Sequence, residues 1–126
     1  SQERKLNDKI TIRIAHTAND REIANIIKKA LNDTGIATKS MIDNTNPAHA
    51  TLKISAKKLF KEIYGSQMAK INIDFQLLDN QNKQIIANQL ELSASSTIND
   101  KQAERAALKK LTKQISNSSI FTILGF

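Results

Sequence analysis

The feature that most constrains the fold is a strict alternation of apolar and polar residues between positions 69 and 77. The apolar side chains are Ala69, Ile71, Ile73, Phe75 and Leu77. A period of two is typical of a β-strand that buries one face. After turn residues at 79–82 a similar pattern returns between 86 and 94, so the two segments predict a β-hairpin. The apolar face of such a hairpin needs a second layer to cover it.

Two amphipathic helices are predicted to form that layer. The first should span Asp20–Asn32, with Asn19 as its N-cap and Glu22 reaching back to it. The second should span Asp100–Ser116, with Asn99 or Asp100 as its N-cap. Their apolar stripes are Ile23, Ile26, Ile27, Ala30 and Leu31 in the first, and Ala103, Ala107, Leu108, Leu111 and Ile115 in the second.

The hydrophobic pattern predicts three more β-strands. Residues 10–14 alternate in the same way, and Ile36–Ile42 is a short second strand followed by a surface loop at Asp43–Pro47. A third strand runs from Leu52, but its apolar phase slips by one residue near Lys57–Lys58. Such a slip predicts a β-bulge, and a helix over residues 56–64 is the competing interpretation.

The order of elements predicts an α+β fold. One mixed, mostly antiparallel sheet of four to five strands should carry both helices on one face. Residues 10–116 should form this single domain, because a chain of 126 residues suits one domain. Residues 1–9 are a polar N-terminal segment, and residues 117–126 form an apolar C-terminal tail.

The tail is rich in large apolar side chains and favours a strand by composition. An exposed apolar segment usually marks a contact surface. The tail should therefore fold back over the domain's own core, or insert into a partner through Phe121 and Phe126.

Little in the sequence suggests catalysis. The chain has no cysteine and only three glycines, which excludes a thiolate site and a glycine-rich phosphate loop. His16 and His49 show no metal-ligand spacing, and His16 with Asp20 makes at most half of a catalytic triad. We therefore expect a binding protein that is not an enzyme and needs no metal or cofactor.

The net charge of +7 favours anionic partners. Its clearest local source is the strand that carries Lys53, Lys57, Lys58 and Lys61. We expect the last three to bind an anionic ligand, while the alternative is that these lysines protect an edge strand from aggregation. Nucleic acid is a weaker candidate, because the five aromatic residues do not alternate with basic ones as a stacking surface requires.

Between Asp20 and Ile115 the order of elements resembles that of the lipopolysaccharide-assembly outer-membrane lipoproteins, the LptE family. Three stretches carry the resemblance: REIANIIKKALNDTGI, PAHATLKISAKKLFKEIYG and AKINIDFQLLDNQNKQII. The layout is also similar to that of auxiliary lipoproteins of lipid-transporting ABC systems and of the TolB N-terminal domain. The connection before the last helix is shorter here than in the LptE family, and the ending IFTILGF has no counterpart there.

The resemblance implies a location at the periplasmic face of the outer membrane, with a lipidated cysteine preceding residue 1 as the only membrane anchor. It implies a β-barrel protein partner, whose lumen the domain would plug, and a role in delivering lipopolysaccharide. Lys61 stands where that family commonly has a basic residue before the hairpin turn. The similar families leave open a second interpretation, in which the domain scaffolds an envelope protein complex without a lipid ligand.

Overall fold

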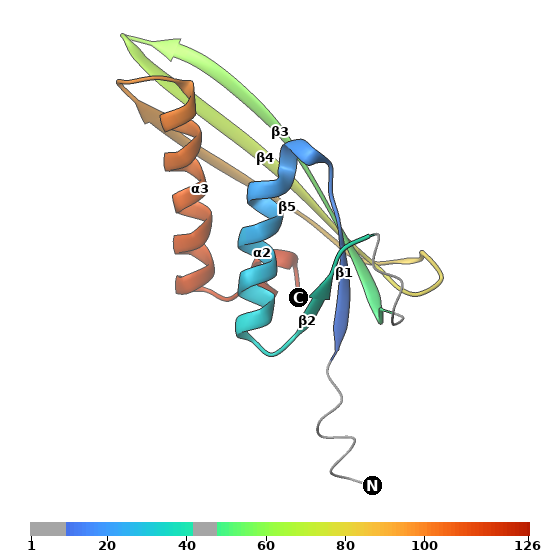
Figure 1. Ribbon diagram of the computed structural model, residues 1–126. Helices are drawn as coiled ribbons and strands as arrows, with labels where there is room; N and C mark the ends of the chain where they lie inside the picture. The colour runs from blue at the N-terminus through green and yellow to red at the C-terminus, as the bar shows by residue number, and fades with distance from the viewer. Residues whose placement is uncertain (1–9, 42–47) are drawn as a thin grey trace, which may run out of the picture.

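The computed structural model describes residues 10–41 and 48–126. Its elements are β1 (Thr11–Ala15), a 3-10 turn η1 (Ala18–Asp20), α2 (Arg21–Asp33), β2 (Ala37–Lys39), β3 (Ala50–Ile63), β4 (Ser66–Leu78), β5 (Gln84–Ser96), α3 (Asp100–Asn117) and α4 (Ile120–Leu124). The strands form one sheet in the order β2-β1-β3-β4-β5 (Figure 1). This confirms the predicted α+β fold with a single mixed sheet.

The sheet has a parallel part and an antiparallel part. β1 runs parallel to both β2 and β3, whereas β3, β4 and β5 form an antiparallel meander of three long strands. The second strand is shorter than predicted, Ala37–Lys39 in place of Ile36–Ile42. The loop predicted at Asp43–Pro47 and the polar segment 1–9 lie outside the described residues.

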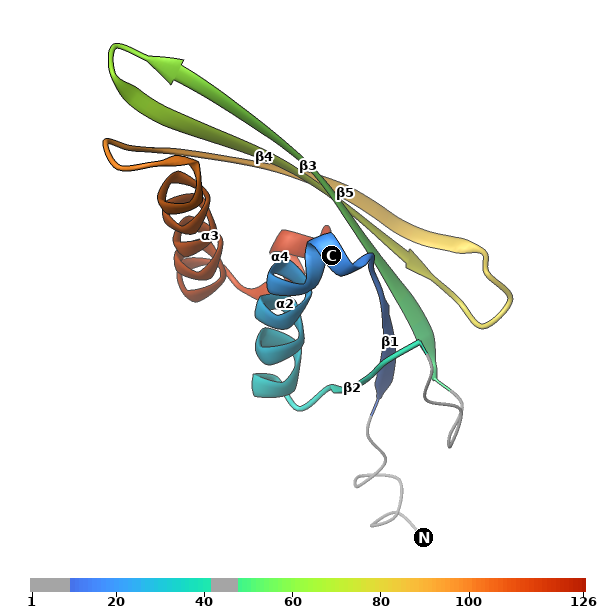
Figure 2. The same ribbon diagram turned by 45° about the horizontal axis from the view of Figure 1, so that its top comes forward.

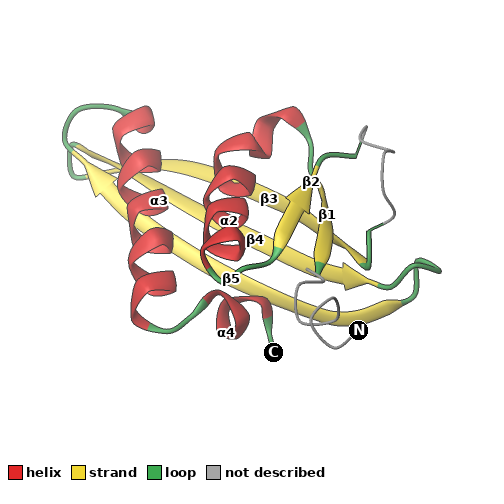
Figure 3. Ribbon diagram, turned by 60° about the horizontal axis from the view of Figure 1, so that its bottom comes forward, coloured by secondary structure: helices red, strands yellow, loops and turns green. Residues whose placement is uncertain are grey.

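Both long helices cover the same face of the sheet, as Figures 2 and 3 show. The predicted stripes meet the predicted strand faces in one core, in which Ile23, Ile27, Leu31 and Leu111 are fully buried. Phe75 lies among them at 1% exposure. None of the helices in the described part of the chain is long and apolar enough to cross a membrane.

The start of α2 differs from the prediction. The capping box is wrong, because η1 precedes the helix and Asp20, not Asn19, occupies the N-cap position. The Asp20 side chain is buried and makes no cap bond; it accepts a hydrogen bond of 3.0 Å from the Thr17 hydroxyl. The cap of α3 is as predicted, since the Asn99 side chain accepts from the Gln102 amide at 2.9 Å.

The predicted bulge in β3 is wrong, and so is the alternative helix. β3 pairs residue by residue with β4 through Lys57 and Lys58, and the irregularity lies instead at Leu77/Leu78, between β4 and β5. The alternation of β3 therefore continues unbroken, which leaves Leu59 61% exposed on the face away from the helices. The helices do not cover this end of β3. Burial in the core therefore does not determine which way its apolar side chains point.

The tail is a short helix rather than a strand. Ile120, Ile123 and Leu124 have the spacing of one helical face, and all three are buried in the core. The Ser119 hydroxyl caps the helix by accepting from the Thr122 amide at 3.2 Å. The Asn88 side chain of β5 donates to the Ile123 carbonyl at 2.8 Å. The tail thus folds back on the domain's own core, the first of the two placements considered.

Candidate functional site

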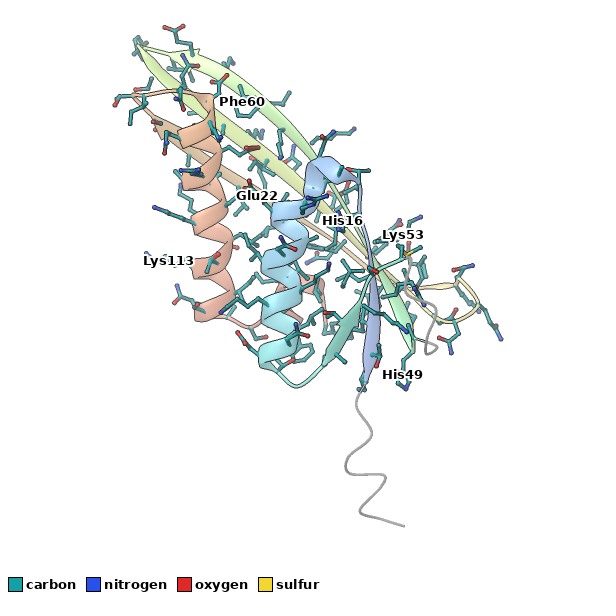
Figure 4. The ribbon with its side chains drawn as sticks, viewed as in Figure 1. His16, Glu22, His49, Lys53, Phe60 and Lys113 are labelled. Carbon is teal, nitrogen blue, oxygen red and sulfur yellow. The ribbon has the colours of Figure 1, made fainter. Side chains whose placement is uncertain are left out.

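The face of the sheet opposite the helices is uncovered and polar. Cross-strand register places Lys53 opposite Gln76 and Ser55 opposite Asp74, with Gln89 of β5 beyond Asp74. Two adjoining hollows of about 910 and 500 Å³ lie on this face and share Asp74 and Gln89. We call this surface the outer face; its polar side chains include His16 and Lys53, which Figure 4 labels, together with Ser55, Lys57, Asn72, Asp74, Gln76, Gln89 and Glu91.

A line of three lysines runs along β3 on the outer face. Lys53, Lys57 and Lys61 stand four residues apart, so successive side chains project roughly 13 Å from one another. Within residues 10–41 and 48–126, none of the three side chains makes a hydrogen bond or an ion pair. Unpaired ammonium groups in a row present a continuous attraction for an anionic partner.

Lys58 does not belong to this line. Its side chain points to the helix face, where Nζ lies 2.8 Å from Glu104 Oε1 of α3 and donates to the Asn19 carbonyl at 3.2 Å. Both side chains of the ion pair are about three-quarters buried, at 25% and 21% exposure. The four lysines grouped by sequence therefore divide between two faces, because β3 keeps its alternation where a bulge was predicted.

Replacing Lys58 by Ala should lower the free energy of unfolding by about 1–2 kcal/mol, since Glu104 would keep its charge in a largely buried position without its cationic partner. Urea unfolding followed by circular dichroism measures the change. Lys57→Ala is the matched control and should stay within about 0.5 kcal/mol of wild type, as exposed positions do. Equal stability of the two variants would show that the ion pair contributes nothing.

Of two carboxylates on the outer face, Glu91 forms an ion pair with a described lysine and Asp74 does not. Glu91 Oε1 lies 3.3 Å from Lys70 Nζ across the β4–β5 pair, a cross-strand ion pair of opposite charges. Both side chains are about half exposed, so the pair contributes little to stability. Asp74 makes no such pair with any residue that the structure describes, and it stays available to an external donor.

The histidines have structural partners. His49 Nδ1 accepts from the Thr11 amide at 2.9 Å and extends the pairing of β1 with β3. His16 Nδ1 lies 2.6 Å from the Thr17 carbonyl oxygen, while Asp20 is held by the Thr17 hydroxyl, so the two do not form half of a triad. In the described part of the chain, no three His, Asp or Glu side chains gather closely enough to hold a metal.

Phe121 and Phe126 lie on the solvent side of the tail. They are 37% and 61% exposed, and their rings meet edge to face with centroids 5.9 Å apart. Gly125 makes this possible with φ at 101°, a left-handed backbone that favours glycine, and a Cβ there would lie 3.1 Å from side-chain atoms of both Ile86 and Asn88. The two rings form a small aromatic knob whose role as a partner contact stays a prediction.

Several solved structures have a fold similar to that of this chain. No family model and no curated protein matches the chain. A minor lipoprotein from Acinetobacter baumannii superposes with a TM-score of 0.68 at 17% identity, covering 91% of this chain and 93% of that one. The fold is one that solved bacterial lipoproteins share.

Two further structures show how widely this fold is distributed. A Xanthomonas campestris protein of the DUF330 family has a TM-score of 0.63 at 13% identity, over 92% of this chain and 85% of that one. Lipoprotein GNA1162 from Neisseria meningitidis has a TM-score of 0.54 at 10% identity, over 86% and 99%. Identities this low establish the shared fold and nothing about ligands.

Proposed function

We propose that this chain is a non-catalytic accessory lipoprotein of the bacterial cell envelope. It assists lipopolysaccharide assembly at the periplasmic face of the outer membrane by binding a β-barrel partner and an anionic glycolipid. The observation that carries the proposal is the outer face, with its polar hollows and its line of Lys53, Lys57 and Lys61. The fold shared with solved lipoproteins supports the location, and a lipidated cysteine before residue 1 would supply the anchor.

The chemistry of the outer face suits both ligands. Amide and hydroxyl side chains such as Ser55, Asn72 and Gln89 donate and accept hydrogen bonds, as the polar wall of a barrel lumen requires. The lysine line suits the phosphates of a glycolipid, because an ammonium group is a strong point donor to phosphate oxygens. Lys57 and Lys61 keep the anion-binding role predicted for them, and Lys53 takes the place of Lys58.

Replacing Lys57 and Lys61 together by Glu should weaken lipopolysaccharide binding by at least tenfold in a direct titration, because two attractions become repulsions. The thermal midpoint should stay nearly unchanged, since exposed lysines contribute only about 0–1 kcal/mol each. Wild-type binding should weaken as salt is added, because exposed charges are screened beyond roughly 8–10 Å.

Lys28→Glu with Lys29→Glu on α2 provides a control with the same change in charge on the opposite layer. Only the β3 variant should lose affinity. Equal affinity of the wild type and the Lys57/Lys61 variant for lipopolysaccharide would show that the lysine line does not bind the glycolipid. The proposed ligand would then have no site on this face.

The aromatic knob favours a second candidate function. In it the domain scaffolds an envelope protein complex without a lipid ligand, and Phe121 and Phe126 contact the partner. Exposed aromatic pairs are typical anchors of protein interfaces. Under this alternative, Phe121→Ser with Phe126→Ser abolishes co-purification with an envelope protein, while lipopolysaccharide titration shows no binding even by the wild type.

A further inference from the structure

The solvent side of α3 is strongly basic. The helix carries five lysine or arginine residues against two acids, Asp100 and Glu104. Asp100 is the first residue of the helix, and Glu104 turns inward to pair with Lys58 on β3. The rest of the helix up to Asn117 contains no carboxylate.

Four of these cations form a regular row: Lys101, Arg105, Lys109 and Lys113. Their spacing of four residues advances about 6 Å and turns about 40° per step, so the row keeps to one side of the helix. That side is opposite the buried stripe of Ala107 and Leu111. All four are exposed, and none is paired with any residue in the described ranges. We call this row the α3 basic face; Figure 4 labels its last member.

Exposed apolar side chains lie at the same end of the molecule as the start of α3. Ile98, in the loop that leads into α3, is 74% exposed, and Tyr64, in the β3–β4 turn, is wholly exposed. Gln67 pairs with Ser96, which brings this turn and this loop side by side, as Figures 1 and 3 show. Tyr64 also has φ at 48°, a left-handed backbone that costs a non-glycine residue about 1–2 kcal/mol. Turn stability alone therefore does not explain a tyrosine there.

We propose that the α3 basic face, together with this exposed apolar end, docks on the surface of an anionic phospholipid bilayer. The α3 basic face lies against the lipid phosphates, and Ile98 and Tyr64 enter the interface between headgroups and acyl chains. Peripheral membrane binding combines electrostatic attraction with a small amount of buried apolar surface, and these two surfaces together offer both.

Other features of the helix layer favour lipid over nucleic acid as the occupant. The basic face carries no aromatic side chain on which bases would stack. Beside it, a groove of about 320 Å³ between α2 and α3 has Ile26 and Leu108 among its lining residues, with Arg105 and Lys109 of α3 on one side and Glu22 of α2 on the other. Apolar side chains beside cations suit amphiphiles, not a hydrated phosphate backbone.

The inference goes beyond the proposed function and does not depend on it, because the outer face lies on the other side of the sheet. Each surface can therefore be removed separately. Neutralising Arg105, Lys109 and Lys113 to Gln changes the charge by the same amount as neutralising Lys53, Lys57 and Lys61 to Gln.

The test is co-sedimentation of the full chain with vesicles of phosphatidylcholine containing one-third phosphatidylglycerol. The α3 variant should partition roughly a hundredfold more weakly than wild type, at about fivefold for each cation removed. The outer-face variant should stay within severalfold of wild type. Ile98→Ser with Tyr64→Ser should weaken partition at least tenfold, since burial of one large apolar side chain already stabilises by that much. Vesicles of phosphatidylcholine alone should bind little protein.

Three results would overturn the proposal. The first is no sedimentation of the wild type with the anionic vesicles. The second is an equal loss in the two triple variants, which would reduce the effect to net charge. The third is binding to random-sequence duplex DNA that is tighter than vesicle binding and is lost in the α3 variant, which would make nucleic acid the occupant. Thermal midpoints of all variants exclude loss of folding as the cause, and lipopolysaccharide titration of the outer-face variant tests the proposed function separately.

Discussion

Deleting residues 119–126 is expected to lower the free energy of unfolding by roughly 4.5–9 kcal/mol, at about 1.5–3 kcal/mol for each large side chain removed from the core. Three such side chains are lost, Ile120, Ile123 and Leu124, each at 7% exposure or less. The deletion also removes the carbonyl that accepts from the Asn88 side chain and uncovers Ile86. Because small domains are stable by only about 5–15 kcal/mol, the shortened chain should be partly unfolded at room temperature.

Urea unfolding of the two proteins, followed by circular dichroism, measures this loss. Phe121→Ser with Phe126→Ser is the matched control, because it changes only exposed side chains of the same tail. That variant should lose less than about 1 kcal/mol, as surface changes do. A deletion that left stability at the wild-type value would show that α4 does not hold to the core, and that the tail is free to serve a partner.

Truncating Phe75 to Ala is expected to cost about 3–5 kcal/mol, as the removal of buried aromatic side chains does. Phe75 of β4 pairs with Ile54 of β3 on one side and Asn88 of β5 on the other, and it is 1% exposed beneath the helices. The cavity left there would be enclosed by the sheet and the helix layer, so the surrounding side chains have little freedom to fill it.

The same denaturation measurement applies, with Gln76→Ala as control. Gln76 is the next residue on the same strand but faces outward, and its replacement should change stability by less than about 0.5 kcal/mol. Phe75→Leu should fall between the two at about 1–1.5 kcal/mol, since most of the volume is kept. Similar losses for Phe75→Ala and Gln76→Ala would contradict the assignment of the core to this face.

The elements that sequence alone predicted are those with a sustained hydrophobic period. The hairpin of β4 and β5 and the helices α2 and α3 appear within three residues of the predicted bounds. Their periods of 2 and 3.6 are set by backbone geometry, and each apolar face must be buried somewhere. One sheet and two helices leave few ways to do so, which is why the α+β class and the shared helix face were also predictable.

The tertiary structure decided whatever depended on partners distant in sequence. The tail folds as a helix because the core offers a site for Ile120, Ile123 and Leu124, which overrides a strand-prone composition. Lys58 faces inward because Glu104 of α3 meets it there, whereas its neighbour Lys57 faces the solvent on the other side.

The proposed surfaces follow the same division. The alternation along β3 already implied that Lys53, Lys57 and Lys61 share a face, once no bulge interrupts it. The placement of Ile98 and Tyr64 at the same end of the molecule came only from strand register, since 34 residues separate them along the chain. A local pattern determines which way a side chain points, because backbone geometry repeats over a few residues. Which side chains come together depends on long-range pairing, which a local pattern does not contain.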